Sequence, residues 1–252
     1  MPGRGEVKQQ LIAIIKKRPL PYRWASSLYW ALRAEHLAEL VIGTRAREKQ
    51  WTRREIGEGY WKNRDHPSRH FLAERIAAFS SLNSVLEIGC ASGPGLYLLA
   101  KRFPQAQIVG IDINAEAIDY GNRQFRSEGL TNVTLMVGKA DELSMFPDGS
   151  FDVVFTNALL IYIGPDKIRE VTQKMLHLAS RALVLMELHF FEPNAKDPSG
   201  LGIYQGGNWI RDYTALLKQF VAVEQMRVTK IPQGIWPAEP WDRLGAVIEV
   251  TL

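Results

Sequence analysis

From Ser84 onward, the sequence alternates short apolar runs with longer amphipathic stretches. This alternation is typical of strand and helix units in a mostly parallel sheet, and it restricts the chain to an α/β fold with helices on both faces. Strands are predicted at residues 84–88, 108–111, 133–137, 151–155 and 182–187. Helices are predicted between them, at residues 95–102, 115–126 and 166–178.

Local residues agree with the boundaries of two of these helices. Pro94 suits a first helical turn, because the N–H that proline lacks would have no intrahelical partner there. Asn114 is a predicted N-cap for the helix at 115–126, and Gly129 is predicted to end that helix. The assignment therefore rests on capping residues as well as on periodicity.

The pattern changes after the fifth strand. Residues 192–208 contain two prolines and four glycines and are predicted to form a long loop, followed by a helix at 209–220. Apolar segments at 221–228 and 246–250 are predicted to pair as an antiparallel hairpin at the edge of the sheet. The segment between them, residues 231–237, is predicted to be a loop.

Residues 1–80 are predicted to form a helical extension, and residues 81–252 the main domain. Two helices are predicted early in the extension, at 7–17 and 24–41. The first is amphipathic, with apolar residues on one face and basic residues around it, so it suits either a membrane surface or a groove on the rest of the protein. We favour packing on the protein, because that is the commoner behaviour of amphipathic helices.

The charge of the chain is divided unevenly. The whole chain has a formal net charge of +4, but residues 1–80 hold 16 Lys and Arg against 8 Asp and Glu, and the remainder holds 15 against 19. Clustered cations attract anions, so the N-terminal third is a candidate contact for an anionic membrane, a phosphorylated substrate or a nucleic acid. A solvated surface without a partner is the simpler alternative.

Composition limits the cellular setting. No apolar run approaches the roughly 18 residues of a membrane span, and the charged start of the chain does not resemble a signal peptide. The single cysteine, Cys90, cannot form an internal disulfide, and five scattered histidines offer no zinc-ligand spacing. We therefore expect a cytoplasmic protein with no bound metal, and peripheral contact with the inner face of the membrane through residues 1–43 is an alternative.

The most informative segment runs from Ser84 to Gly95, where a strand ending near Glu87 turns through small residues into a helix. Such a turn directs backbone N–H groups and a helix N-terminus at one pocket, which suits a nucleotide-like ligand. A glycine-rich turn alone does not identify the ligand, because dinucleotide-binding dehydrogenases use the same device.

Three acids narrow the choice of ligand. Glu87 lies at the tip of the first strand, where a carboxylate attracts an ammonium group and repels a pyrophosphate. Asp112 ends the second strand, at the position from which a carboxylate accepts hydrogen bonds from ribose hydroxyls. Asp141 lies just beyond the third strand, where it can accept a hydrogen bond from an adenine amino group. Glu87 therefore disfavours a dinucleotide, whereas Asp112 alone fits either kind of cofactor. Together the three acids lie at three successive strand ends.

The sequence between about Ser84 and Glu187 resembles the class I S-adenosylmethionine-dependent methyltransferases. Residues 85–93, Val-Leu-Glu-Ile-Gly-Cys-Ala-Ser-Gly, are similar to the first motif of that family, residues 109–112 to the second, and residues 146–155 to its lead into the fourth strand. The resemblance implies S-adenosylmethionine as the cofactor. It also implies a Rossmann-like sheet of seven strands whose last strand is antiparallel.

The resemblance also implies which residues contact the cofactor. It assigns the methionine portion to Glu87, Gly89, Cys90, Ala91, Ser92 and Gly93, the ribose to Asp112, and the adenine to Ala140, Asp141 and Glu142, with Ile113 and Asn157 as further contacts. Two positions depart from the family pattern. Ala91 replaces the usual middle glycine and is expected to be tolerated through a negative φ. Asn157 stands where many members have a different small or polar residue.

Methyl transfer is an in-line displacement, so the two reactants must be held in line, and an oxygen acceptor usually needs a general base. His189 is the predicted base, because it directly follows the fifth strand at the carboxyl edge, where ligands bind in open α/β sheets. Glu187 is the weaker candidate. The alternative for His189 is a structural role at the surface or as a cap.

A block of aromatic, cationic and histidine residues at 60–70 precedes the core. In the resembled family such a segment often folds over the cofactor as a lid. The predicted lid and substrate residues are Tyr60, Arg64, His66, Arg69, Tyr162 and Trp209. We expect Arg64, His66 and Arg69 to contact an anionic acceptor or the cofactor carboxylate, or else to cap a helix that begins near Ser68.

The methyl acceptor is less defined than the cofactor. Segments 66–69, 93–101 and 160–164 are similar to uncharacterised methyltransferases of bacterial surface-glycan clusters, which favours a small molecule or a lipid-linked saccharide, with oxygen preferred to nitrogen as the acceptor atom. One alternative is a catalytically inactive member of the fold that binds membrane or nucleic acid through its basic N-terminal third; we consider nucleic acid the less favoured partner. The other is a nicotinamide-dependent dehydrogenase.

Overall fold

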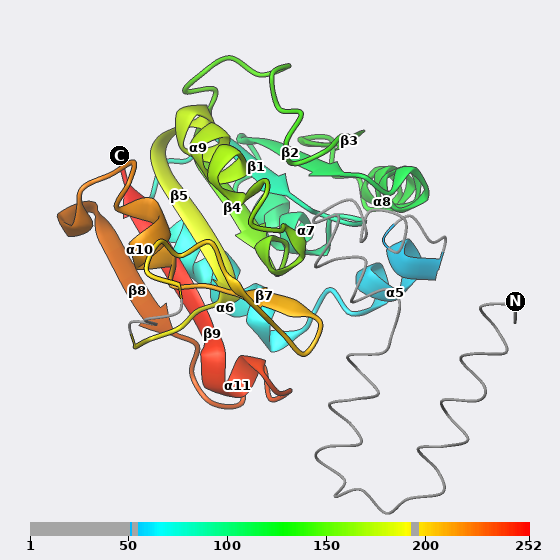
Figure 1. Cartoon of the computed structure of the whole chain (residues 1–252). Coiled ribbons are helices and arrows are strands. Elements are labelled where there is room, and N and C mark those ends of the chain that lie inside the picture. Colours follow the sequence, from blue (N-terminus) through cyan, green and yellow to red (C-terminus); the bar gives the residue numbers. More distant parts are fainter. Residues whose placement is uncertain (1–50, 52–54, 193–196) are drawn as a thin grey trace, which may run out of the picture. The chain divides into compact units, whose positions relative to one another are not determined.

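The computed structural model describes residues 51, 55–192 and 197–252 of the chain (Figure 1). The helices predicted at 7–17 and 24–41, and the proposed membrane contact through residues 1–43, lie outside the described residues. Among the described helices, none is both long and apolar enough to cross a bilayer.

The described residues contain a seven-stranded sheet with the order β3-β2-β1-β4-β5-β9-β8 (Figure 1). Its strands are β1 (Ser84–Ile88), β2 (Gln107–Asp112), β3 (Val133–Val137), β4 (Phe151–Asn157), β5 (Ala179–Leu188), β8 (Met226–Lys230) and β9 (Gly245–Thr251). The first five pair in parallel, whereas β9 runs antiparallel to both β5 and β8. The predicted Rossmann-like sheet with an antiparallel last strand is confirmed.

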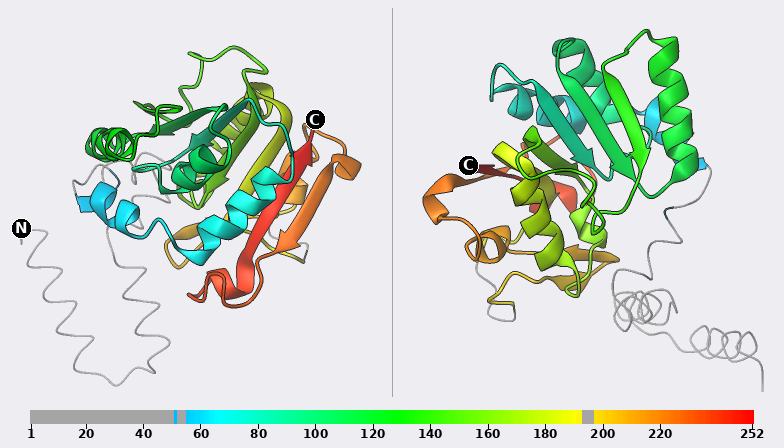
Figure 2. Two further views of the ribbon diagram at one scale, coloured as in Figure 1. Left: turned by 180° about the vertical axis from the view of Figure 1, so that it is seen from behind. Right: turned by 90° about the horizontal axis from the view of Figure 1, so that it is seen from above.

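Helices cover both faces of this sheet (Figure 2). One face carries α6 (Pro67–Ala77), α7 (Pro94–Arg102) and α8 (Ala115–Ser127), and the other carries α9 (Ile168–Leu178) and α10 (Tyr213–Leu217). Successive residues of a strand point to opposite faces, and β5 supplies apolar side chains to both. Val184 and Met186 join the core under α6 and α7, while Leu183 and Leu185 join the core under α9. This two-sided burial explains the nearly continuous apolar sequence of β5.

The described residues before β1 pack on the same core. They form α5 (Glu55–Lys62) and α6, which were predicted as part of the N-terminal extension. Trp61 contacts Tyr97 of α7 and Phe125 of α8 edge to face, and Leu72 and Ile76 are buried in the core that α7 shares. Burial of a large apolar side chain contributes roughly 1.5–3 kcal/mol, so these helices are held to the sheet by substantial apolar contact.

The starts of two helices agree with the sequence analysis. Pro94 occupies the first turn of α7. Asn114 caps α8, because its side chain accepts a hydrogen bond of 3.0 Å from the backbone N–H of Ala117. Both predictions are confirmed.

The segment between β5 and β8 differs from the prediction. The helix predicted at 209–220 is wrong for its first residues, which form β7 (Asn208–Ile210), and only α10 is helical. β7 pairs with β6 (Ile203–Gln205), which lies in the predicted long loop. Gly206 and Gly207 have φ values of 61° and 90°, which form a two-residue hairpin turn. Trp209 and Ile210 are buried as part of this hairpin. Their apolar side chains were interpreted as the apolar face of a helix.

The edge hairpin forms as predicted, although its first strand lies later than predicted and its second is longer by one residue at each end. β8 begins at Met226, after a short 3-10 turn, η2 (Val223–Gln225). The loop between β8 and β9 contains α11 (Trp241–Leu244), whose Trp241 stacks on Trp236 with 3.9 Å between the ring centroids.

Candidate active site

A pocket lies at the carboxyl ends of the parallel strands β1, β2, β3 and β4, and encloses about 920 Å³ with the open solvent at its mouth included. Two residues from before the sheet, Trp51 and Tyr60, contribute to it. The carboxyl edge of an open α/β sheet is where such folds bind ligands. The lining residues are Trp51, Tyr60, Ile88, Gly89, Ala91, Ile111, Asp112, Ile113, Gly138, Lys139, Ala140, Asp141, Asn157, Ala158, Leu159, Tyr162, Ile163, Lys167 and Val171.

The loop after β1 is folded against the end of β2. The backbone N–H groups of Gly89 and Cys90 both donate to the carbonyl oxygen of Ile111, at 2.7 and 3.0 Å. Gly89 has a φ of 78°, and a Cβ there would lie 2.7 Å from Cδ1 of Leu159. Both the conformation and the close approach therefore require glycine at this position.

Ala91 corrects an expectation. Alanine was expected to be tolerated here if its φ were negative, but its φ is 50°, in the left-handed region that an alanine rarely adopts. The backbone N–H of Ala91 donates to Oδ2 of Asp112 at 2.8 Å, and the side chain is buried. The hydrogen bond to the end of β2 and the surrounding packing hold the strained conformation.

Asp112 links the loops that follow β1 and β2. Its Oδ2 accepts from Ala91, and its Oδ1 accepts from the backbone N–H of Asn114 at 2.8 Å. Burial raises the pKa of Asp112, although both hydrogen bonds favour the ionised form. Asp112 lines the pocket together with Ile113.

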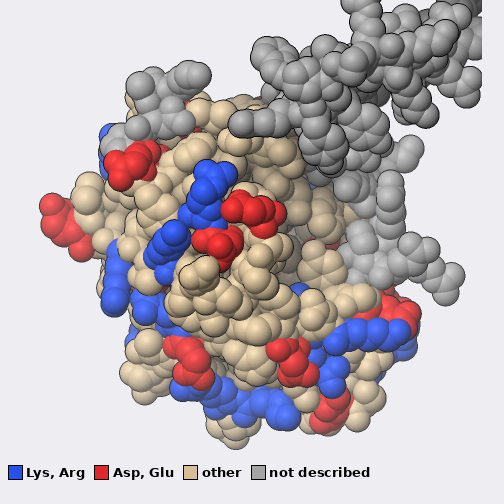
Figure 3. Space-filling view, turned by 90° about the horizontal axis from the view of Figure 1, so that it is seen from below, with Lys and Arg blue, Asp and Glu red and all other residues tan. Residues whose placement is uncertain are grey.

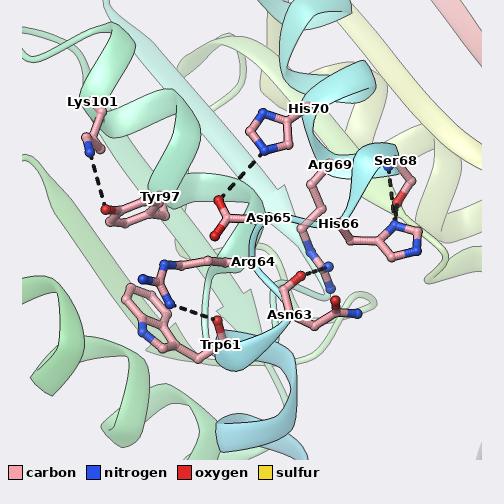
Figure 4. Close-up of polar contacts among 10 residues, drawn as sticks. All are labelled: Trp61, Asn63, Arg64, Asp65, His66, Ser68, Arg69, His70, Tyr97 and Lys101. Atoms are coloured by element: carbon pink, nitrogen blue, oxygen red, sulfur yellow. Dashed lines mark hydrogen bonds and ion pairs between the residues drawn. The ribbon is translucent and has the colours of Figure 1, made fainter. Parts of the chain in front are cut away.

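Glu87 and Arg69 lie buried beside the pocket rather than in its open lining. Burial raises the pKa of Glu87 to about 8, with Arg69 lowering it and Asp112 raising it further. Within the described residues, Oε2 of Glu87 has no hydrogen-bond partner. The guanidinium of Arg69 donates to the carbonyl oxygen of Asn63 (Figure 4) and lies 5.7 Å from the ring centroid of Tyr60. A buried carboxyl group and a buried cation therefore adjoin one end of the pocket.

The other end of the pocket combines aromatic rings with an ion pair. The rings of Trp51 and Tyr162 are 4.6 Å apart between centroids. Asp141 forms an ion pair with Lys167, and although burial opposes ionisation, this lysine holds the pKa of Asp141 below its ordinary value. Ala140 lines the pocket here, whereas Glu142 is exposed, lies outside the lining and approaches Lys139 at 3.9 Å.

Three residues of the loop after β1 face away from the open pocket. Cys90 is buried, and burial raises the pKa of its thiol. Ser92 donates through Oγ to the carbonyl oxygen of Gly57 at 2.7 Å, which ties the loop to α5. Gly93 has a φ of 77° and precedes α7. These three residues lie outside the pocket lining, whereas Gly89 and Ala91 of the same loop belong to it.

The residues predicted as bases also lie outside the lining. His189 is buried, its Nδ1 accepts from the backbone N–H of Tyr213 at 3.2 Å, and burial lowers its pKa. Glu187 is buried and accepts hydrogen bonds from the turn that follows β4. Trp209 of β7 is buried and packs on Tyr204, with 5.1 Å between ring centroids.

The residues of the block at 60–70 lie in two different places, some at the pocket and some away from it. Tyr60 lines the pocket, and Arg69 lies beside it. Arg64 instead donates to the carbonyl oxygen of Trp61 and lies over the ring of Tyr97, and the His66 side chain accepts from the backbone N–H of Ser68 as the N-cap of α6 (Figure 4). Of the two predictions for this block, helix capping is therefore the one that His66 fulfils.

Several lining residues have no counterpart in the sequence analysis, among them Trp51, Leu159, Lys167 and Val171. Lys167 and Val171 reach the pocket from the start of α9, whose apolar face gives no sign of this role. Leu159 lies next to Asn157 in the same loop, so the position of that loop after β4 was the available signal. Trp51 has no recognisable motif around it.

Comparison with known proteins agrees with this fold. Residues 85–181 match the protein family described as "Methyltransferase domain". A trans-aconitate 2-methyltransferase from Afipia carboxidovorans is 34% identical over 109 residues, which cover 42% of this chain and 38% of that protein. A fatty-acid O-methyltransferase from Mycolicibacterium smegmatis is 40% identical over 70 residues, covering 28% of this chain and 24% of that protein.

A solved structure shows the same fold over a longer stretch. The magnesium protoporphyrin IX methyltransferase from Synechocystis, crystallised with bound S-adenosylhomocysteine, has a TM-score of 0.54 at 15% identity, covering 77% of this chain and 85% of that one. Sheet order and family match agree: residues 85–181 match a methyltransferase-domain family, and the sheet that contains them has the same fold as the Synechocystis structure. The sequence matches span less than half of the two curated relatives, so they identify this domain rather than a particular activity.

Proposed function

We propose that the protein is an S-adenosylmethionine-dependent methyltransferase that binds its cofactor in the pocket and methylates a small molecule. The observation that carries the proposal is the buried carboxyl group of Glu87, whose Oε2 has no described partner, beside the buried guanidinium of Arg69. An α-amino acid carries an ammonium and a carboxylate on one carbon. A buried carboxyl group and a neighbouring cation are complementary to both charges.

The carboxyl group of Glu87 is complementary to an ammonium group of a ligand. A buried carboxyl oxygen without a hydrogen-bond partner is costly, and an ammonium group would supply both the countercharge and the donors. Arg69 would bind the cofactor carboxylate through guanidinium N–H groups. A pyrophosphate would meet the acids Glu87, Asp112 and Asp141, which argues against the dehydrogenase alternative.

The rest of the cofactor follows the pocket along the sheet edge. Asp112 would accept hydrogen bonds from the ribose hydroxyls. The adenine would lie among Ile113, Ala140 and the aromatic pair of Trp51 and Tyr162. Asp141 is already held by Lys167, so we propose that it binds the adenine amino group only through an oxygen that the lysine leaves accessible.

When bound, the sulfonium supplies an electrophilic methyl group and leaves as a neutral thioether when the acceptor displaces it. The residues of the chain contribute binding and alignment, because an in-line displacement depends strongly on how the two reactants are held. Asn157 at the end of β4 and Ala158 in the loop that follows line the pocket. We propose that this loop aligns the acceptor with the methyl group.

Binding of S-adenosylhomocysteine, measured by isothermal titration, tests the cofactor assignment. We expect Glu87→Gln and Asp112→Asn each to weaken binding by about tenfold or more, equivalent to about 1.4 kcal/mol, because each removes a charged contact in a buried site. Asp148→Asn and Glu224→Gln are matched controls, since both acids are exposed and lie outside the lining. Wild-type protein that does not bind, or equal affinity in all four variants, would contradict the proposal.

For the acceptor we propose an oxygen atom. The two curated relatives are named for trans-aconitate and for O-methylation of a fatty acid, which are carboxylic acids. A carboxylate is already ionised at neutral pH and needs no general base, in keeping with the position of His189 outside the described pocket lining. The predicted saccharide acceptor is the second candidate, supported by the resemblance to glycan-cluster methyltransferases.

Incubating the protein with methyl-labelled S-adenosylmethionine and cell extract separates these acceptors. A methyl ester of a carboxylic acid releases labelled methanol in alkali, whereas a methyl ether on a saccharide keeps its label. We expect alkali-labile label in a small-molecule fraction. Label that survives alkali would favour the saccharide, and label on an amine nitrogen would overturn the oxygen proposal.

A further inference from the structure

Two oppositely charged side chains are completely buried on either side of the turn that follows β4. Glu187 at the end of β5 and Arg211 just after β7 each have a relative exposure of 0%. Between them lie residues 159–163, which include the short 3-10 helix η1 (Leu160–Tyr162). Buried charges are rare unless they are paired and hydrogen-bonded, so the partners of this pair show what it does.

The carboxylate of Glu187 accepts hydrogen bonds from one end of the turn. Its Oε1 accepts from the backbone N–H groups of Leu159 and Leu160, both at 3.0 Å, and from the hydroxyl of Thr156 at 2.8 Å. Its Oε2 accepts from the backbone N–H of Ile161 at 3.3 Å. Both carboxylate oxygens are thus occupied, which suits a structural role better than that of the predicted base.

The guanidinium of Arg211 binds the other polarity of the same turn. Nη1 donates to the carbonyl oxygen of Leu160 at 2.6 Å, and Nη2 donates to that of Ile163. Nε donates to the carbonyl oxygen of Leu201 at 2.9 Å, which connects the turn to the segment before β6. The positive N–H end of the turn therefore faces the carboxylate, and its negative carbonyl end faces the guanidinium, so both charges stabilise one orientation of the peptide dipoles.

We infer that Glu187 and Arg211 act together as a clamp that positions one wall of the cofactor pocket. Leu159, Tyr162 and Ile163 of the clamped turn line that pocket, whereas neither charged residue does. Tyr162 pairs with Trp51 at the end of the pocket that we assign to the adenine. The inference rests on the proposed cofactor site, and both members of the clamp are positioning residues because they act through the turn.

Conservative variants test the clamp while keeping a hydrogen-bonding side chain at each position, because an apolar replacement would leave the buried groups around it without partners and threaten folding. Arg211→Lys keeps the positive charge but loses the planar fork that reaches two carbonyls. Glu187→Gln keeps the shape but loses the charge and one acceptor oxygen. We expect each to weaken binding of S-adenosylhomocysteine by about tenfold and to speed amide hydrogen exchange at Leu159, Leu160 and Ile161.

A partly buried pair provides a control, with Glu249 buried and Arg75 half-buried. Arg75 of α6 and Glu249 of β9 form an ion pair and share two hydrogen bonds, but neither residue lines the pocket. Arg75→Lys and Glu249→Gln should lower the melting temperature without changing the affinity or the exchange of residues 159–161. A general loss of stability is therefore distinguishable from loss of the clamp.

The double variant of Glu187→Gln and Arg211→Lys tests whether the two residues act as one unit. Because either change releases the same turn, we expect the double variant to bind about as weakly as the single variants, whereas independent effects would multiply to about 100-fold. Wild-type affinity and unchanged exchange in both single variants would overturn the clamp. If the wild type does not bind the ligand, the cofactor proposal fails, and the exchange measurement still tests the clamp.

Discussion

Ala91 and Ala158 both line the pocket and both have a positive φ, of 50° and 57°. A left-handed conformation costs an ordinary residue roughly 1–2 kcal/mol, and such strain tends to gather at functional sites. Each is held by a hydrogen bond from its backbone N–H, Ala91 to Asp112 and Ala158 to the carbonyl oxygen of Met186. At the scale of single residues, the loops around the pocket are therefore fixed by contacts with neighbouring strands.

Replacing Ala91 with glycine should relieve this strain. We expect Ala91→Gly to raise the free energy of unfolding by about 0.5–1 kcal/mol, because glycine adopts a φ of 50° without steric cost. Urea denaturation measures the change. Ala100→Gly in α7 is the control, since a buried helical alanine has no such strain and its replacement should destabilise by about 1 kcal/mol or more. A destabilised Ala91→Gly protein would show that the φ is not a source of strain.

At the scale of elements, the sequence predicted the regular part of the sheet closely. Strands β1 and β3 have the predicted bounds, and β2, β4 and β5 are two to four residues longer than predicted. Apolar runs define these strands because both faces of the sheet are covered, so almost every side chain of a central strand must be apolar. Capping and proline residues defined the starts of α7 and α8 for equally local reasons.

The hairpin of β6 and β7 shows where local pattern was insufficient. Its strands have three residues each, too few for a period to be recognised. Trp209 and Ile210 are buried, and Arg211 reaches the turn after β4. The role of Arg211 depends on backbone pairing between the ends of β7 and β5. There the N–H of Arg211 donates to the carbonyl oxygen of Leu188, and the N–H of Phe190 donates to the carbonyl oxygen of Arg211. No local property of the sequence indicates the contact between Arg211 and the turn after β4.

At the scale of the whole molecule, the basic residues are distributed unevenly between the described residues and the rest of the chain. The residues that the structure describes hold 18 Lys and Arg against 23 Asp and Glu, so the basic excess of the chain lies in the other residues. On the face shown in Figure 3, cationic and anionic side chains are interspersed. Exposed ion pairs among the described residues include Arg102 with Glu74 and Arg123 with Asp119. Exposed pairs of this kind contribute little to stability.

Buried acids instead make the stability of the molecule depend on pH. The pKa of Glu87 is raised from 4.5 to about 8, mainly by burial, with Arg69 opposing and Asp112 adding to the shift. Between these values the folded protein holds a proton that the unfolded chain has lost. Stability from this group is therefore fully present below about pH 4.5 and decreases as pH rises towards 8.

Glu87→Gln should remove this dependence. We expect the free energy of unfolding of the wild type to fall relative to the variant between pH 5 and 8, by at most about 1.4 kcal/mol per pH unit for one proton. Urea denaturation at a series of pH values measures it. Glu187 also has a raised pKa, of about 7, but it is present in both proteins and cancels in the comparison. Parallel curves for wild type, Glu87→Gln and the exposed control Glu224→Gln would contradict the shift.

The sequence by itself determined the class of fold and most of the acids and loops around the pocket. Glu87, Asp112 and Asp141 lie at or just beyond the carboxyl ends of β1, β2 and β3. Parallel strands present their carboxyl ends at one edge, so strand order alone brings these acids together. Such a site can be predicted from the sequence, because the position of each residue is fixed by the strand at whose end it lies.

Only the tertiary structure decided the roles of residues whose environment comes from distant segments. His189 and Glu187 were predicted as site residues because they lie near the carboxyl end of β5. The structure showed instead that His189 is buried against Tyr213 and Glu187 against the turn after β4. It also brought Trp51 and Lys167 to the pocket and gave Ala91 its positive φ. Burial, hydrogen-bond partners and backbone strain depend on contacts between segments far apart in the chain, and a local sequence pattern does not specify those contacts.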